Sequence, residues 1–122
     1  MLYREMLRAK IHRLTVTETQ VDYEGSITLD AALIEAADIL PGEKVQVVNV
    51  NNGNRFDTYA ILGERNSGVV CLNGAAARLC SAGDIVIVMA YAAVEDAAAK
   101  ELVSKVVYVD NQNRMVSKVG VA

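Results

Sequence analysis

Apolar and polar residues alternate along much of this chain, a pattern typical of strands with one buried face. Near the N-terminus the alternation would place Lys10 and His12 on one face and Ile11 and Arg13 on the other. The polar connection at 17–22 predicts at most one short helical turn. Strands are predicted at 9–16, 27–29, 43–50, 55–62, 69–72 and 85–92, and the last, which is the most apolar, would be central.

Short helices are predicted between some of these strands. Asp30 is a suitable N-cap, and Pro41-Gly42 would end the helix that it begins. Asn73 would cap a second helix in the same way. A third helix has acidic residues first and Lys100 near its end, which suits the helix dipole. These helices are expected at 31–40, 74–79 and 95–102.

Turn signals separate the remaining elements. Asn51-Asn52-Gly53-Asn54 predicts a hairpin turn, and 64–68 a tight polar turn. In the C-terminal tail, strands at 103–109 and 115–121 would flank a hairpin turn at 110–113. The tail carries no recognisable chemistry, and both packing on a neighbouring subunit and fraying are open for it.

One pattern occurs twice in the chain. Ile27 to Val50 and Val70 to Ala92 each read as a strand, a capped short helix, a Gly-acidic turn and an apolar strand. Two such halves in so short a chain predict one closed barrel, since closure removes exposed sheet edges. The expected fold is therefore mainly β, a small closed barrel with short helices.

Composition narrows the function classes. The 122 residues form one domain by length, and 52% are hydrophobic, with no Trp, which suits a Val-rich core. The net charge of −3 argues against a nucleic-acid partner, which needs a basic face. One local basic cluster could instead be a solvated strand edge or one wall of a polar site; it contains Arg4, Arg8, Lys10, His12 and Arg13.

Localisation follows from what the sequence lacks. No apolar run is long enough to span a membrane, and the N-terminus has no signal-peptide core. Cys71 and Cys80, without a secretory signal, are expected to be free, reduced and structural. A cytoplasmic protein with no membrane partner is the simplest interpretation, and no metal site is predicted.

Four motifs carry more specific information, because they occur in order over most of the chain. They are Lys10-x-His12-Arg13, Tyr23-Glu24-Gly25-Ser26, Asn52-Gly53-x-Arg55-Phe56-x-Thr58-Tyr59 and Asn73-Gly74-Ala75-Ala76. Together they resemble the pyruvoyl-dependent aspartate 1-decarboxylases, from Met6 to Tyr91. Val48 departs from the pattern, since some members carry Trp there.

The resemblance implies that the chain cleaves itself after Gly25, giving 1–25 (β chain) and 26–122 (α chain). The Ser26 hydroxyl would attack the Gly25 carbonyl, and elimination and hydrolysis would leave a covalent pyruvoyl group in place of Ser26. A hydroxyl suits an internal nucleophile, and a preceding glycine has no Cβ to block it. Thr58 matches the threonine that the family links to this processing step.

The resemblance also implies decarboxylation of L-aspartate to β-alanine through a pyruvoyl Schiff base, supplying pantothenate biosynthesis. Tyr59 would be the proton donor at the active site. The substrate carboxylates would need cations, and Arg55 offers a planar fork that fits one. The other implied binding residues are Lys10, His12, Asn73, Gly74, Ala75 and Ala76, with Tyr23 near the scissile bond.

For the assembly, the resemblance implies a double-psi β-barrel, a homotetramer with active sites between subunits, and a possible maturation factor. Two alternatives are open. The stretch from Ile27 to Val45 also resembles the half-barrel of AbrB-like DNA-binding proteins, which would make the chain a binding module. Alternatively, the barrel could be kept and self-processing lost.

Overall fold

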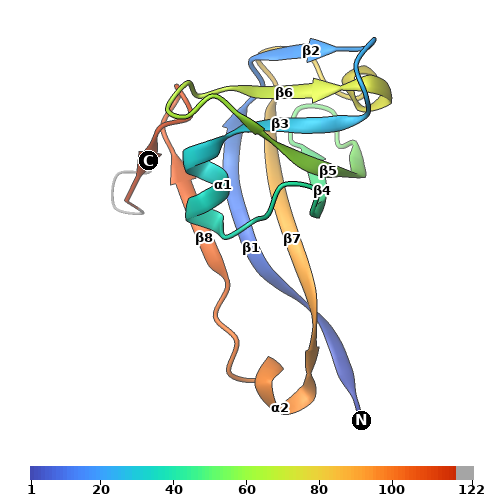
Figure 1. Ribbon diagram of the computed structural model, residues 1–122, viewed down its shortest axis with the longest axis vertical. Helices are drawn as coiled ribbons and strands as arrows, with labels where there is room; N and C mark the ends of the chain where they lie inside the picture. Colours follow the sequence, from blue (N-terminus) through green and yellow to red (C-terminus); the bar gives the residue numbers. More distant parts are fainter. Residues whose placement is uncertain (118–122) are drawn as a thin grey trace.

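The computed structural model describes residues 1–117, a mainly-β molecule with a long two-stranded arm (Figure 1). The strands are β1 Tyr3–Thr15, β2 Glu18–Gln20, β3 Ser26–Asp30, β4 Lys44–Asn49, β5 Arg55–Gly63, β6 Val70–Asn73, β7 Ile85–Glu95, β8 Lys105–Val109 and β9 Met115–Val116. The helices are α1 Ala31–Ala37, the 3-10 helix η1 Gly74–Arg78 and α2 Asp96–Ala99.

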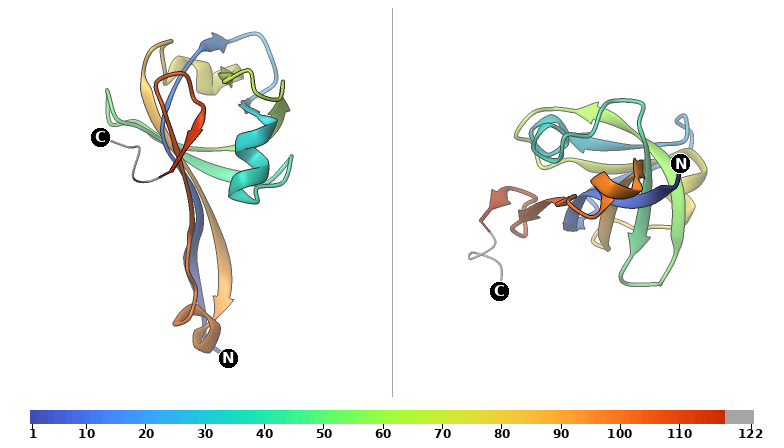
Figure 2. Two further views of the ribbon diagram at one scale, coloured as in Figure 1. Left: turned by 90° about the vertical axis from the view of Figure 1, so that its left-hand side faces the viewer. Right: turned by 90° about the horizontal axis from the view of Figure 1, so that it is seen from below.

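All of these strands belong to one sheet, in the order β2-β6-β3-β5-β4-β7-β1-β8-β9. β1 lies between β7 and β8, whereas β2 pairs with β6 at the far end of the sheet. Only Val16 and Thr17 separate β1 from β2 in the chain, so the chain itself brings strands that are far apart in the sheet order close together. The strands therefore curl around a common core, as the view from below shows (Figure 2), and the mainly-β barrel prediction is confirmed.

The predicted repeat is visible in the pairing. β3 pairs antiparallel with β6, and β4 with β7, so equivalent strands of the two halves meet each other. β3 also runs parallel to β5, just as β6 runs parallel to β2. The glycine turns match too, since the Gly42 N–H donates to Ala60 O (2.7 Å) and the Gly83 N–H to Val16 O (2.8 Å). Two similar halves thus close one barrel.

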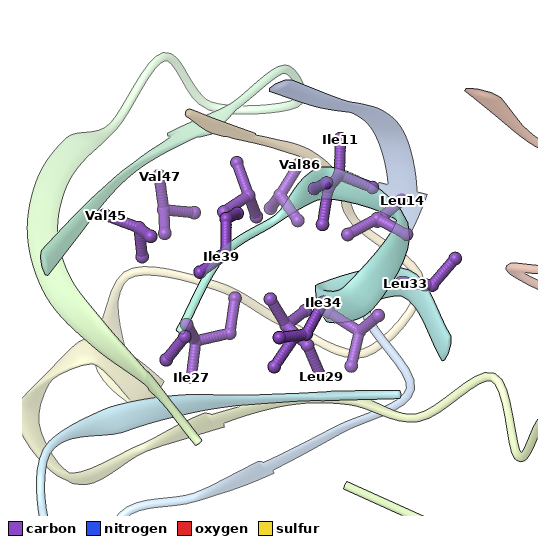
Figure 3. Close-up of a cluster of buried hydrophobic side chains, with 14 of the residues drawn as sticks. Ile11, Leu14, Ile27, Leu29, Leu33, Ile34, Ile39, Val45, Val47 and Val86 are labelled. Atoms are coloured by element: carbon purple, nitrogen blue, oxygen red, sulfur yellow. The ribbon is translucent and has the colours of Figure 1, made fainter. Parts of the chain in front are cut away.

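The core lies inside this barrel and beneath α1. Figure 3 shows side chains from β1, β3, β4, β7 and α1 pointing toward one another. Burying each such side chain contributes roughly 1.5–3 kcal/mol. The largest fully buried side chains are Ile11, Leu14, Val16, Ile27, Leu29, Leu33, Ile34, Val45, Val47, Val70, Leu72 and Val86.

The arm extends from the barrel where β1 and β7 continue as a pair. Tyr3 to Leu7 pair with Tyr91 to Glu95, and α2 lies at the tip beside the N-terminus (Figure 1). Arg4 Nε lies 2.6 Å from Asp96 Oδ1 and ties the strand to that helix. The arm was not predicted: β1 begins at Tyr3 and not at Ala9, and β7 ends at Glu95 and not at Ala92.

Several local expectations were wrong. Part of the connection at 17–22 forms β2, because it finds a parallel partner in β6. Arg13 does not share a face with buried Ile11, because a β-bulge there gives Arg13 a φ of 59°. The helix α1 stops before Pro41, because Asp38 adopts a left-handed conformation and its N–H bonds back to Glu35 O and Ile34 O.

The C-terminal elements are shorter than expected. α2 covers four residues instead of 95–102, β8 begins at Lys105, and β9 covers Met115–Val116. Ser117 is not in a strand, and the remaining part of the strand predicted at 115–121, from position 118 on, lies outside the described residues. Asn113 is buried and donates to Thr15 O and Gly68 O, both at 2.8 Å, so the turn at 110–113 is fixed to the barrel. No helix within 1–117 is long and apolar enough to cross a membrane.

Candidate active site

Ser26 is the first residue of β3 and is fully buried, although the five residues before it are all exposed. Its Oγ donates to the Glu24 carbonyl oxygen at 3.0 Å. The same Oγ accepts a hydrogen bond from Asn73 Nδ2, also at 3.0 Å. A hydroxyl is therefore held at the junction of an exposed loop and a buried strand, one peptide bond after Gly25.

Asn73 lies directly opposite Ser26 in the β3–β6 ladder. Its side chain makes no hydrogen bond to the helix that follows, so the expected capping role is wrong. Instead Nδ2 donates to Ser26 Oγ and to Thr28 Oγ1, the latter at 2.9 Å. The ladder explains this choice, because paired residues on one face bring their side chains within hydrogen-bonding reach.

Cys71 also belongs to this cluster, although the sequence did not mark it as a site residue. Its Sγ lies 3.2 Å from Asn73 Oδ1 in a buried position. Burial raises the pKa of this thiol, and nearby Glu18 adds to the effect, so the group keeps its proton and can donate it. The thiol thus orients the amide so that Nδ2 faces Ser26. Position 71 shares a strand face with 73, which was the available signal.

Gly74 packs against the exposed loop. A Cβ added here would lie 2.7 Å from both the Cα and the N of Gly25 and 2.9 Å from Tyr23 O. Its φ of +66° is also unfavourable for residues with a side chain. Gly74 is therefore required for the loop to approach β6. Beyond it in η1, Ala75 is exposed and Ala76 half-buried.

The far end of η1 is fixed by a second polar cluster. The Leu79 carbonyl oxygen accepts hydrogen bonds from the side-chain amides of Asn49, Asn52 and Asn54 at 3.1–3.2 Å. The predicted turn at 51–54 therefore holds the helix that presents Gly74 to the loop. This role of the turn was not anticipated, because it depends on a contact between distant segments.

Thr58 and Tyr59 lie on β5 just before Ala60, where β5 runs alongside β3. Ile27 pairs with Ala60 in the parallel β3–β5 ladder. Continuing that register backward puts Ser26 beside Tyr59 and Gly25 beside Thr58. Tyr59 is 37% exposed, and a phenol there could exchange protons with a ligand at Ser26.

Next to these residues the barrel surface is hollowed. The hollow has a volume of about 410 Å³ and is bordered by Tyr23, Thr28, Cys71 and Asn73, among others. Tyr23 is 56% exposed at its edge. Asn73, the hydrogen-bond partner of Ser26, thus borders an open space that a small molecule could enter.

The predicted cations lie elsewhere on the sheet. Lys10 on β1 and Gln46 on β4 both pair with Met89 on β7, so their side chains share one outer face. Arg55 lies on the same face, and its Nη1 donates to Gln46 Oε1 at 2.9 Å. Val48 is directly opposite Arg55. Gln46 is a second residue that sequence reasoning did not single out.

His12 follows Lys10 on β1 and faces β8. Its ring meets the ring of Tyr108 edge to face, with centroids 5.8 Å apart. Its Nδ1 is buried without a hydrogen-bond partner among the described residues. Burial lowers the pKa of the imidazole, and the charges of Lys10 and Arg13 lower it further, so the neutral form is favoured. His12 is thus a poor cation for binding a carboxylate at neutral pH.

The residues of the candidate site therefore form two groups. Ser26, Gly25, Asn73 and Gly74 come together at the start of β3. Within 1–117, no hydrogen bond or ion pair joins Ser26 to Arg55, Lys10 or His12. Arg55 is four residues from Tyr59 along β5, which is about 13 Å in a strand.

Nearly the whole chain is similar to known proteins of one family. Residues 2–116 match the family described as aspartate decarboxylase. The chain is 57% identical over 116 residues to the aspartate 1-decarboxylase of Thermoanaerobacter pseudethanolicus, covering 95% of this chain and 99% of the relative. It is 56% identical over 115 residues to that of Carboxydothermus hydrogenoformans, covering 94% and 91%. The match spans both halves of the barrel, which disfavours an AbrB-like binding module.

Proposed function

Because the chain belongs to the aspartate decarboxylase family, we propose that it decarboxylates L-aspartate to β-alanine, using a pyruvoyl group made from its own Ser26. The observation that carries this proposal is the environment of Ser26. Its hydroxyl is fully buried, bonded to Asn73 Nδ2, and follows Gly25 in an exposed loop.

The first step is self-cleavage. Ser26 Oγ attacks the Gly25 carbonyl carbon, and the peptide C–N bond is replaced by an ester. Loss of the Ser26 α-proton then breaks the Cβ–O bond, which releases 1–25 with a free carboxylate. Hydrolysis of the remaining dehydroalanine, with loss of ammonia, gives the pyruvoyl group at the start of 26–122.

The residues around the bond have separate parts in this step. Thr58, beside Gly25 in the extended register, is suited to donate to the oxygen that becomes negative during attack. Asn73 holds the Ser26 hydroxyl in place. Gly74 leaves room for the loop, since a Cβ there would overlap Gly25. These features fit formation of a pyruvoyl group at position 26.

Once formed, a pyruvoyl group supplies the electron-withdrawing ketone that amino-acid decarboxylation needs. Tyr59, beside position 26, is suited to return a proton to the substrate carbon. Arg55 and Lys10 are suited to bind the substrate carboxylates. His12 contributes less charge than the sequence suggested, since its neutral form is favoured.

The separation of the two groups supports an assembly. Arg55 lies about 13 Å along β5 from Tyr59, so we place the cationic face of one copy against the Ser26 region of another. A homotetramer with sites between subunits fits this arrangement. Membership in the family further supports a cytoplasmic enzyme supplying β-alanine for pantothenate, with a maturation factor as a possible helper.

Intact-mass spectrometry of the purified protein tests the proposal. We expect two polypeptides, 1–25 and 26–122, the larger blocked to Edman sequencing. Borohydride reduction in the presence of L-aspartate should add a trapped adduct to that larger polypeptide, and β-alanine should accumulate without reductant. A single uncleaved chain that stays inactive after prolonged warming would overturn the proposal and favour a barrel without processing.

A further inference from the structure

Arg55 is bonded to a neutral group. Its Nη1 donates to Gln46 Oε1 at 2.9 Å, and the hydroxyl of Tyr91 lies 3.3 Å from the same oxygen. In the described part of the chain, Arg55 forms no ion pair with a carboxylate. Two donors converging on one oxygen also fix which way the Gln46 amide is turned.

The neighbouring carboxylate on the same face, that of Asp57, is already paired with a lysine. Asp57 shares the outer face with Arg55, and it lies directly opposite Gln46 in the β4–β5 ladder. Its Oδ2 is 3.4 Å from Lys44 Nζ, so that lysine offsets its charge. Val48, opposite Arg55, has no polar atom to offer. Gln46 is thus the near side chain that can hold Arg55 without cancelling its charge.

This arrangement has a consequence for binding. A guanidinium has five N–H donors, and a carboxylate is bound best by two of them together. A side chain already held in position loses less entropy when it binds. A neutral partner such as Gln46 holds the guanidinium in this way, whereas an acidic side chain in its place would compete with the ligand carboxylate for the charge of Arg55.

We propose that Gln46, itself held by Tyr91, is the positioning residue that presents Arg55 to a substrate carboxylate, and that its neutrality sets the affinity for dicarboxylates. The inference rests on the proposed function, since it takes Arg55 as a carboxylate-binding residue of the decarboxylation site. Gln46 and Tyr91 also border a surface groove of about 510 Å³, with Lys44, Glu5 and Asp57 among its other lining residues, so a small molecule has access to the Gln46 side chain.

The test uses the cleaved protein and measures β-alanine formation over a range of L-aspartate concentrations. Gln46→Glu should raise KM about tenfold and leave kcat within about twofold, because only carboxylate binding is weakened. Succinate, which has no amine, should lose affinity as a competitive inhibitor in parallel. Gln46→Met keeps the length without a charge and should raise KM about threefold.

Gln112→Glu is the matched control, since it makes the same chemical change on an exposed turn, and it should leave KM unchanged. Cleavage is checked by mass for every variant, and Gln46→Met keeps the test informative if Gln46→Glu does not mature. Equal KM values for Gln46→Glu, Gln46→Met and Gln112→Glu would overturn the inference about Gln46 and leave the proposed function standing. A wild-type protein that cleaves but forms no β-alanine would overturn the proposed function instead.

Discussion

The two halves of the barrel contain equivalent loops that are held very differently. The loop at 64–69 enters β6, and the loop at 21–25 enters β3. The carboxylate of Asp30 accepts the backbone N–H groups of Asn66 (3.0 Å) and Gly68 (2.9 Å). Gly68 is buried, and its carbonyl oxygen also accepts a hydrogen bond from Asn113.

The other loop lacks this anchor. Asn73 takes the place in β6 that Asp30 takes in β3, but its amide bonds to the side chains of Ser26 and Thr28 instead of to the loop backbone. Gly25, equivalent to Gly68, is exposed. The same topology thus stabilises one glycine peptide and leaves the other accessible, and the difference lies mainly in one pair of side chains.

The largest expected effect comes from moving the hydroxyl between these loops. Ser26→Ala should abolish cleavage, because no other group can make the ester. Val69→Ser places a hydroxyl after Gly68, and it should create no second cleavage site, because both polar groups of Gly68 are already bonded. Intact mass distinguishes these outcomes, and cleavage after Gly68 would contradict the comparison.

Next in size is Gly74→Ala. The added Cβ would meet Gly25 at 2.7 Å and force the loop away from Asn73, so we expect cleavage to slow at least tenfold, about 1.4 kcal/mol in the barrier. Gly53→Ala is the matched control, since Gly53 also has positive φ (+79°) but open space around it. Similar cleavage half-times for the two variants would assign the effect to backbone strain alone.

Asp30→Asn should affect stability more than chemistry. Burial raises the pKa of this carboxyl, but hydrogen bonds from the Gly68, Ala32 and Asn66 backbone and the charge of Arg114 lower it, and the net pKa is lowered. A lowered pKa means stability that is present above the unfolded value, about 3.9, and is lost as the pH falls through the folded value.

We therefore expect Asp30→Asn to lower the free energy of unfolding by about 2 kcal/mol at neutral pH, with the difference from wild type shrinking in acid. Urea unfolding at several pH values measures this. Asp22→Asn, on the exposed loop, should change little. A difference that stays constant with pH would show that charge is not involved.

The smallest expected effect is that of Cys71→Ala. Removing the thiol frees the Asn73 amide to turn, and cleavage should slow about two- to fivefold, the value of one modest hydrogen bond. Cys80→Ala deletes a second buried thiol, which makes no hydrogen bond to Ser26 or Asn73 within 1–117, and controls for the cavity. The cleavage half-time, followed by mass, should be altered only by the first variant.

Much of the fold was accessible from the sequence because it depends on local signals. Alternation located the main strands, and the recurrence of Ile27-Thr28-Leu29-Asp30 as Val70-Cys71-Leu72-Asn73 predicted two similar halves. β2 was missed, since three polar residues become a strand only when β6 is beside them. The arm was missed because its strands are mostly exposed and carry no regular pattern.

The candidate site was only partly predictable. Motifs pointed to Ser26 and Asn73, but their hydrogen bond depends on the register between β3 and β6, which periodicity does not fix. Gln46 was not found for the same reason, since its contact with Arg55 Nη1 crosses from β4 to β5. Cys71 contacts Asn73 Oδ1 two residues along the same strand, but its role depends on Asn73 facing Ser26 across the β3–β6 ladder.

The place of β1 in the sheet has a consequence for the proposed cleaved form. β1 lies between β7 and β8, and it contributes buried Ile11 and Leu14 to the core. A peptide 1–25 could therefore leave only if the barrel opened. The mature protein would be an obligate two-chain complex, in which dissociation and unfolding are one event, and its melting temperature would rise with protein concentration.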